Sequence, residues 1–381
     1  MTLVPIADLV APVTRKGPSR DSTTFTYVDL SSVDAAGKRI VAPSEVLTSE
    51  APSRARQNLR TGDVLVSTVR PNLNGVASVD NHLDGAVGST GFAVLRANDE
   101  LLDKRYLFHW VRTPQFVESM TRLATGASYP AVTEAIVKAS QIPLPPLPEQ
   151  RRIAEILDEA DALDRPVTDA HGKLSSLRQS LFSSAVSEVK TRVSIADAAL
   201  KVTDGTHQAP GWSTAGVPFL FVSNITSGSI NYSTSKYVSL ETYNRLTRHS
   251  PIEKGDVLYS AVGSYGVPAV VDSDEPFLFQ RHIAHIKPRP DVVDSWYLHA
   301  ALASPDFLNQ AHRVARGVAQ KTVTLGDLSR LTIPLPSVEA QQHVAKQLEA
   351  VRGAHASLTH QRSSIRNLFA SLQHRAFRGE L

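Results

Sequence analysis

One stretch of this chain occurs twice, and this duplication limits the possible fold more than any other feature. Residues 142–187 and 333–378 each open with Ile-Pro-Leu-Pro and continue as a long segment with helical spacing. The two copies align without a gap at an offset of 191 residues. Self-similarity at a fixed offset is typical of a repeated structural unit, so we expect two equivalent halves.

Both copies carry a narrow apolar stripe. Its members are separated by alternating steps of three and four residues, which is the spacing of positions a and d in a coiled coil. A stripe this narrow needs a partner helix, and the nearest candidate is the other copy. The predicted seam consists of Ile153, Ile156, Leu163, Leu174, Leu177 and Leu181 in the first copy and Val344, Val351, Leu358, Ile365, Leu368 and Leu372 in the second, with Ala160, Val167, Ala170 and Ala354 as smaller members.

The connection between the copies predicts an antiparallel pair. The first helix leads into the block 191–332 and the second leads out of it, so a compact block brings the end of one helix near the start of the other. The first helix is more acidic and the second more basic, which weakly favours their pairing. The alternative is that each helix packs only on its own domain. Pro166 should kink or break the first helix, because a proline at this position clashes with the carbonyl of Ala162.

The composition is that of an ordinary globular protein with room for two or three domains. Its 381 residues are 42 % apolar and 20 % charged, and there is no cysteine for disulfide or thiolate chemistry. No apolar run approaches the roughly 20 residues of a membrane span, and the first residues lack a signal-peptide pattern, so we expect a cytoplasmic protein. The net charge of +3 and the pI near 9.0 permit nucleic-acid binding without requiring it.

The repeat extends beyond the helices. The segment 61–80 matches 254–272, with a shared Gly-Asp turn before a predicted strand, and the helical segment 103–123 matches 294–314. We therefore predict an α/β (α+β) fold in which two similar domains are separated by two long helices that form an antiparallel coiled coil, with a pseudo-two-fold internal repeat. The predicted boundaries are 1–147 for the first domain, 148–190 for the central helix, 191–337 for the second domain and 338–381 for the C-terminal helix.

Sequence signatures of catalysis are weak. The chain has no phosphate-binding Gly-x4-Gly-Lys-Ser/Thr loop, no dinucleotide fingerprint, no His-Glu-x-x-His motif and no Gly-x-Ser-x-Gly elbow. Asp-Glu-Pro-Phe at 274–277 is better interpreted as a turn than as an amino-methyltransferase loop. His282 and His285 fall on opposite faces of a predicted strand, which is poor geometry for metal ligands. We expect a non-catalytic chain with no catalytic, cofactor or metal site of its own.

The proline run 143–148 has two interpretations. As a polyproline II segment it could bind an SH3-like groove. We favour a stiff lead-in that ends a strand and opens a helix, with Pro148 and Glu149 in the first turn.

Recognition is the remaining function. Loops beside glycine and proline turns carry side chains suited to base edges and phosphates, at equivalent points of the two halves. Any one of these residues alone is more often a solvated loop residue, but their shared location strengthens the group. The candidates are Arg54, Arg56, Arg70, Asn72, Asn74, Ser128 and Tyr129 in the first half and Thr206, His207, Gln208, Ser264, Tyr265, Arg316, Gln320 and Lys321 in the second.

The segment IPLPPLPEQRRIAEIL that begins at Ile142 closely resembles the helix entrance of the specificity subunit of type I restriction-modification systems. The resemblance covers essentially the whole chain and is carried also by 52–57, 62–73, 89–96, 126–132, 204–210 and 317–323. The helix-entrance motif is specific, whereas the loop motifs persuade only together. The chain departs from the pattern at Pro166 and at Glu339-Ala340-Gln341, which replaces Pro-Glu-Gln in the second entrance.

This resemblance implies a non-catalytic subunit in which each target recognition domain reads one half of an asymmetric, bipartite duplex DNA sequence. The helices would dock two modification subunits, which methylate adenine with S-adenosylmethionine, and through them restriction subunits that use ATP and Mg²⁺. The alternative from another class is a coiled-coil assembly protein whose repeated domains bind proteins rather than DNA. A catalytic methyltransferase or nuclease is a third possibility.

Overall fold

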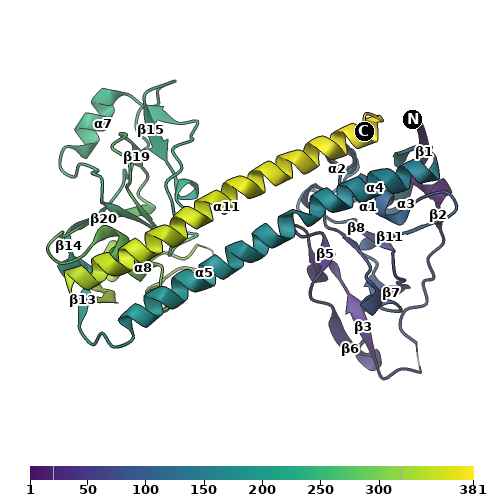
Figure 1. The fold of residues 1–381 in the computed structure, drawn as a ribbon, viewed down its shortest axis with the longest axis horizontal. Helices are drawn as coiled ribbons and strands as arrows, with labels where there is room; N and C mark the ends of the chain where they lie inside the picture. Colours follow the sequence, from purple (N-terminus) through teal and green to yellow (C-terminus); the bar gives the residue numbers. More distant parts are fainter. Residues whose placement is uncertain (20, 319) are drawn as a thin grey trace. The chain divides into compact units, whose positions relative to one another are not determined.

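The computed structural model describes residues 1–19, 21–318 and 320–381, which form two compact units. Unit 1 contains Met1–Thr168 and His360–Leu381, and unit 2 contains Asp169–Thr359. Both boundaries fall inside long helices (Figure 1). Each unit therefore combines a domain, the start of the helix that follows this domain, and the end of the helix from the other copy.

Unit 1 is built from short strands in small sheets. Its strands are β1 (Thr2–Pro5), β2 (Val10–Ala11), β3 (Thr24–Val28), β4 (Val33–Asp34), β5 (Arg39–Ile40), β6 (Ser44–Leu47), β7 (Ala55–Asn58), β8 (Val64–Ser67), β9 (Val76–Ser78), β10 (Val87–Ser89), β11 (Phe92–Ala97) and β12 (Gln141–Leu144). The sheet orders are β2-β11-β8-β9, β6-β3-β10-β7, β1-β12 and β4-β5. The helices of the domain are α1 (Lys104–Trp110), α2 (Pro114–Leu123) and α3 (Glu134–Ala139).

Unit 2 repeats much of this arrangement. Its strands are β13 (Arg192–Ser194), β14 (Ala199–Asp204), β15 (Val217–Leu220), β16 (Tyr237–Val238), β17 (Val257–Ser260), β18 (Pro268–Val270), β19 (Leu278–Phe279), β20 (Ile283–Pro288) and β21 (Thr332–Pro334). The sheet orders are β14-β20-β17-β18, β16-β15-β19 and β13-β21. The helices are α6 (Ile195–Ala198), α7 (Leu240–Thr247), α8 (Ser295–Leu302), α9 (Pro305–Val314) and α10 (Leu325–Arg330).

The two units share a sheet order and a helix order. The sheet β2-β11-β8-β9 corresponds to β14-β20-β17-β18, and the following three helices begin at the same kind of cap in both units. Asp103 and Asp294 accept backbone N–H groups at the starts of α1 and α8. Such side chains satisfy the unpaired donors of a first helical turn and so fix where each helix begins. The predicted α/β fold with an internal repeat is confirmed.

The Gly-Asp turn precedes β8 in unit 1 and β17 in unit 2. Its aspartate is buried in both: Asp63 pairs with Arg96 at 2.7 Å, and Asp256 pairs with His285 at 2.6 Å and with Lys287 at 3.0 Å. A buried carboxylate needs such partners, since an unpaired charge in the interior is costly. His285 is thus held in an internal polar network with Asp256 and Lys287.

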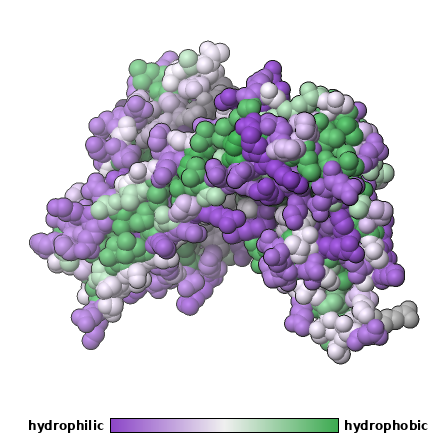
Figure 2. Space-filling model, turned by 45° about the vertical axis from the view of Figure 1, so that its right-hand side comes forward, coloured by the Kyte–Doolittle hydropathy of each residue, from purple (hydrophilic) through white to green (hydrophobic). Residues whose placement is uncertain are grey.

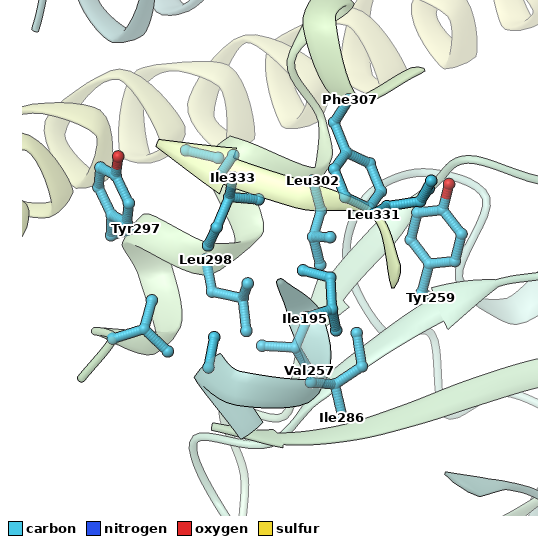
Figure 3. Close-up of a cluster of buried hydrophobic side chains, with 14 of the residues drawn as sticks. Ile195, Val257, Tyr259, Ile286, Tyr297, Leu298, Leu302, Phe307, Leu331 and Ile333 are labelled. Carbon is cyan, nitrogen blue, oxygen red and sulfur yellow. The ribbon is translucent and has the colours of Figure 1, made fainter. Parts of the chain in front are cut away.

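Each domain has its largest core where the sheet meets the helices that follow it. In unit 1 this core includes Tyr106, Trp110 and Phe116. In unit 2 the rings of Tyr259, Tyr297 and Phe307 lie among aliphatic side chains from several strands and helices (Figure 3). These are the side chains that bury the most apolar area, so they contribute most to holding each helix layer on its sheet.

The long helices are α4 (Leu147–Ala162), α5 (Asp164–Val186) and α11 (Val338–Arg378). The first copy is interrupted at Leu163, which keeps right-handed helical dihedrals of φ −66° and ψ −25°. Pro166 lies in the first turn of α5, where its missing N–H removes no helical hydrogen bond, so the predicted break is confirmed. No helix among the described residues is both long and apolar enough to cross a membrane.

A buried glutamine fixes each helix entrance. Gln150 accepts the N–H of Asp103 and donates to the carbonyls of Leu101 and Pro145. Gln341 makes the equivalent three bonds, to Asp294, Val292 and Pro336. The proline run thus serves as a structural lead-in.

A buried tyrosine fixes the strand just before each entrance. The hydroxyl of Tyr106 donates to Pro143 at 2.8 Å, and the hydroxyl of Tyr297 donates to Pro334 at 2.9 Å. These bonds join α1 in unit 1 and α8 in unit 2 to the proline-rich segment at the helix entrance.

The two copies of the long helix are antiparallel within each unit (Figure 1). In unit 1, Arg152 near the start of α4 donates to the carbonyl of Leu381, while Asp164 pairs with Arg362 at 2.9 Å. In unit 2, His171 of α5 contacts His355 of α11 at 3.0 Å. The residue numbers rise along one helix as they fall along the other, as predicted.

The helices are rotated from the predicted a and d seam. Leu163, Leu177 and Leu368 are 47 %, 45 % and 47 % exposed, so their assignment to the seam is wrong. The residues one position later face the partner helix, as the contacts of Asp164 and His171 show. The remaining predicted members are buried (Ile153, Val344, Val351, Ala160, Val167), half-buried (Ile156, Leu174, Leu181, Leu358, Ile365, Leu372, Ala170) or exposed (Ala354).

The domains explain this rotation. Ala154 and Leu157 of α4 are fully buried in the core of the first domain, and Ala376 and Phe377 of α11 are buried in the same core. A helix must turn its most apolar contact surface toward the larger core, because burial energy grows with area. Each helix therefore serves a domain and a partner helix together.

Candidate nucleic-acid interface

The loop after α2 and the loop after β8 form one composite surface in unit 1. Residues Thr125 and Ala131 close the first loop as a bridged pair, and Ala131 also bridges Val69 of the second loop. The N–H of Arg70 donates to the carbonyl of Pro130 at 2.7 Å. Backbone bonds at both ends therefore fix the spacing of the two loops.

Four of the predicted recognition residues lie together on this surface. Arg70, Asn72, Ser128 and Tyr129 are exposed, and Tyr129 is 68 % exposed. The guanidinium of Arg70 lies 4.6 Å from the centroid of the Tyr129 ring, a cation–π contact that holds the arginine in place without using its hydrogen-bond donors. Arg70 has a left-handed φ of 49°, which directs its side chain at the cost of backbone strain.

Asn74 has an internal role. Its amide nitrogen donates to the carbonyl of Arg112 at 3.2 Å, and its amide oxygen is buried. Lys38 donates to the Asn74 carbonyl, and burial together with the charge of Arg112 lowers the pKa of Lys38 to about 8. The prediction that Asn74 offers its amide to a base is wrong, because this side chain braces the loop from inside.

Unit 2 has the same composite surface. Thr322 bridges both Arg316 and Val262, and the N–H of Gly263 donates to the carbonyl of Lys321 at 2.9 Å. Gly317 has a φ of 105°, close to the 104° of Gly126 in unit 1, and a Cβ at Gly317 would lie 2.4 Å from the carbonyl oxygen of Gln320. Glycine is therefore required at this turn.

The side chains on this second surface differ from those on the first. Ser264, Arg316, Gln320 and Lys321 are exposed, and Arg316 also approaches Asp327 at 3.6 Å. Tyr265 is half-buried, and its hydroxyl is bonded to Nδ1 of His312 at 2.6 Å. The surface thus offers amide, ammonium, guanidinium and hydroxyl groups on a rigid backbone.

Arg54 and Arg56 lie elsewhere in unit 1. Both are exposed: Arg54 immediately precedes β7 and Arg56 lies in it. This strand belongs to the sheet β6-β3-β10-β7, and Arg56 donates to the carbonyl of Ser53. Their guanidinium groups are open to solvent and form no ion pair among the described residues. The structure does not bring them into the composite loop surface.

Thr206, His207 and Gln208 follow β14 in unit 2. The backbone of Thr206 pairs with Gln280, and Gly205 leaves no room for a side chain, since a Cβ would lie 2.1 Å from the carbonyl oxygen of Phe279. His207 contacts Asp204 at 3.1 Å, and both His207 and Gln208 are exposed. This is a second tight turn with polar side chains at its rim.

Sequence reasoning missed one basic surface in unit 1. Lys16, Asn58 and Arg60 line an open cavity of about 570 Å³. The only signal in the sequence was a lysine beside a glycine, Lys16-Gly17; in the structure Gly17 has a positive φ of 71° and lies beside the carbonyl of Ala55. No cluster of three or more His, Cys, Asp or Glu residues suited to a metal ion occurs in the described part of the chain.

Comparisons with known proteins agree with this arrangement of paired domains. The family described as type I restriction modification DNA specificity domain matches residues 53–166 and 214–365. The specificity subunit of the EcoBI enzyme from Escherichia coli is 24 % identical over 75 % of this chain and 68 % of its own length. The EcoKI specificity subunit from the same species is 21 % identical over 80 % of this chain and 71 % of its own.

Solved structures show the same fold along the full chain. A chain from a type I restriction-modification system, solved in a study of its assembly and conformational transition, is 27 % identical with a TM-score of 0.57, covering 100 % of this chain and 98 % of that one. The specificity subunit from M. genitalium has 14 % identity, a TM-score of 0.57 and coverage of 99 % and 96 %, and so supports the fold alone. Because the matched segments make up most of the sequence and fall in both halves of the repeat, this chain belongs to the type I restriction-modification DNA specificity family and is a DNA-recognition subunit rather than a catalytic one.

Proposed function

We propose that each unit reads one half of an asymmetric, bipartite duplex DNA target, with residues 1–147 and 191–337 as the two target recognition domains. The observation that carries this proposal is the composite loop surface, which has the same backbone bonds in both units but different exposed side chains. A shared scaffold with different side chains is what two readers of different sequences require. Base edges are distinguished by side-chain donors and acceptors, whereas the backbone only positions them.

The exposed groups define what each surface can bind. Arg70 presents a fork of donors suited to guanine or phosphate, and Gln320 presents an amide suited to adenine. Lys321 and Arg316 are suited to phosphates, and Tyr129 offers a ring and a hydroxyl. The 41 residues of α11 amount to about 60 Å of helix, which exceeds the ~34 Å of one duplex turn.

The long helices are proposed to dock two modification subunits and, through them, restriction subunits. Leu163, Leu177 and Leu368 are large apolar side chains on these helices that are about half exposed. Figure 2 shows that one face of the protein carries exposed apolar patches (green) among hydrophilic residues (purple), as a surface that docks other subunits would require. S-adenosylmethionine, ATP and Mg²⁺ belong to the partner subunits in this proposal.

Methylation mapping tests the bipartite target. DNA from cells that express this chain with its modification partner should carry N6-methyladenine at one split, asymmetric sequence. Replacing 191–332 by the equivalent block of a relative should change one half of that sequence and leave the other half unaltered. A change in both halves would contradict modular reading.

Binding by the assembled methyltransferase tests the loop surfaces. Arg70→Ala and Lys321→Ala should each weaken binding to the mapped duplex by roughly tenfold or more and reduce its salt dependence, because each removes a cationic contact. Lys104→Ala removes an exposed lysine at the start of α1, away from the loop surfaces and the long helices, and serves as the matched control, with no expected change. Equal losses in all three variants would point to a general charge effect instead of a recognition surface.

A further inference from the structure

Two histidines face each other between the long helices of unit 2. His171 of α5 and His355 of α11 have their Nδ1 atoms 3.0 Å apart, and their ring centroids are 4.9 Å apart with an interplanar angle of 59°. Both side chains are half-buried. They occupy the positions that the rotation of the helices turns toward the partner helix.

Ser175 orients one of these rings. Its hydroxyl oxygen lies 3.3 Å from Nε2 of His355, one turn along α5 from His171. If Nε2 of His355 carries the proton and donates to Ser175, Nδ1 keeps a free lone pair directed at His171. Histidines that bind metal ions use one ring nitrogen for the ion and donate the other N–H to such an acceptor.

We propose that His171 and His355 form a two-histidine site for one divalent transition-metal ion of the Zn²⁺, Ni²⁺ or Cu²⁺ class, which links α5 to α11. Two imidazole nitrogens that each lie about 2.0–2.1 Å from one ion are roughly 2.9–3.4 Å apart for angles between square and tetrahedral. The observed 3.0 Å lies in this range, so a small shift of the rings admits the ion. Imidazole is a preferred ligand for these three metals, unlike Mg²⁺ or Ca²⁺.

The surroundings predict an exchangeable site. Neither histidine forms an ion pair with a carboxylate in the described residues, and no third His, Asp or Glu there completes a cluster of three. Water would fill the other coordination positions, so the ion would bind reversibly. Its consequence would be a metal cross-link between α5 and α11, which also meet through side-chain packing and the Asp164–Arg362 ion pair.

Titration of the metal-free full-length chain tests this proposal. Calorimetry with ZnCl2 or NiCl2 should show one site that His171→Ala and His355→Ala each weaken by at least tenfold. His343→Ala and His374→Ala remove exposed histidines of α11 elsewhere and should leave this site unchanged. Circular dichroism spectra of all variants establish that the helices remain folded.

Electron paramagnetic resonance with CuCl2 gives an independent readout. One equivalent of Cu²⁺ should show coupling to two imidazole nitrogens in the unaltered chain and to at most one in either single variant. Unchanged spectra and affinities in His171→Ala or His355→Ala would overturn the proposal. Loss of the site in His343→Ala or His374→Ala would overturn it too, because binding would then be adventitious and lie elsewhere on the surface.

Discussion

The two junctions between domain and long helix share a backbone design but differ in the side chains around it. The first junction joins α1 to α4 and the end of α11 in unit 1, and the second joins α8 to the start of α11 and the end of α5 in unit 2. Gln150 and Gln341 make the same three buried bonds in the two junctions. Since these bonds engage backbone groups, they form in both junctions although the neighbouring side chains differ.

The charges around this shared core are reversed. In the first junction Arg112 of the domain pairs with Asp161 of the helix at 2.8 Å. In the second, Arg352 of the helix lies 3.7 Å from Asp272 of the domain and 3.7 Å from the centroid of the Trp296 ring. If the first domain packed on the second helix entrance, Arg112 would face Arg352. If the second domain packed on the first, Asp272 would face Asp161. The reversed charges therefore favour the pairing of each domain with its own helix.

The largest expected difference in stability between the junctions comes from one aromatic residue near the C-terminal end of each long helix, Phe377 of α11 and Phe182 of α5. The Phe377 ring packs on two aromatic rings, Tyr106 at 5.0 Å and Trp110 at 5.1 Å between centroids. Among the described residues, the Phe182 ring packs on one aromatic ring, that of Tyr297 at 5.6 Å. Phe377→Ala should destabilise unit 1 by about 4 kcal/mol and Phe182→Ala should destabilise unit 2 by about 3 kcal/mol, because each leaves a cavity. Urea unfolding with hydrogen exchange resolved by segment would measure both.

Each substitution should affect only its own unit. Loss of exchange protection in α8 on Phe377→Ala, or in α1 on Phe182→Ala, would contradict the division into units.

The second-largest difference between the junctions should be in how their stability depends on pH. Burial and the nearby charge of Arg178 lower the pKa of His299 to about 4, and its buried Nε2 has no hydrogen-bond partner in the described part of the chain. The equivalent residue in unit 1 is Phe108. In the unfolded chain the His299 ring gains its proton near pH 6.5, whereas in the folded chain it stays neutral down to about pH 4. Above pH 6.5 the ring is neutral in both states, so no stability is lost there. The stability of the folded chain falls by up to about 3 kcal/mol as the pH decreases toward 4.

His299→Phe should remove this part of the pH dependence. The measurement is the difference in urea unfolding free energy between this variant and the unaltered chain from pH 7 to pH 4. Parallel curves over that range would show that His299 does not titrate as described. His343→Phe, at an exposed site, is the control.

The hydrogen bonds of Gln150 and Gln341, which are the same in both junctions, should contribute equally to the free energy of unfolding. Gln150→Leu and Gln341→Leu should each cost about 2–3 kcal/mol, because each leaves a backbone N–H and two carbonyls buried without a partner. Both glutamines are almost fully buried, at 1 % and 0 % exposure. Thermal unfolding of the two variants would measure these costs, and a difference above about 1 kcal/mol would show that the surroundings do matter.

The charged pairs should give the smallest effects. A double-mutant cycle on Arg112 and Asp161 should yield a coupling of about 1 kcal/mol, since Arg112 is buried but Asp161 is 42 % exposed and screened. The cycle on Arg352 and Asp272 should give less than about 0.5 kcal/mol, as this pair is longer and exposed on both sides. A coupling energy for Arg352–Asp272 that exceeds the one for Arg112–Asp161 would contradict this order.

Much of the fold was predictable because it depends on local patterns that occur twice. The Gly-Asp turns, the break near Pro166 and the helix entrances follow from backbone restrictions that individual residues impose. The composite loop surface was predictable only in part. Arg70 and Tyr129 lie side by side as grouped, but the inward bonds of Asn74 depend on Lys38 and Arg112, which are distant in sequence.

The sequence by itself determined the duplication, the order of elements and the antiparallel direction of the helices. The helix phase was decided only by tertiary structure. Leu163 and Leu368 fit the heptad spacing of a seam, but they are half exposed. Leu157 and Phe377 are instead buried in the core of the first domain, and this burial sets the rotation of the helices. Periodicity states which residues share a face, but the rotation of that face depends on the total apolar area that all neighbours of the helix offer.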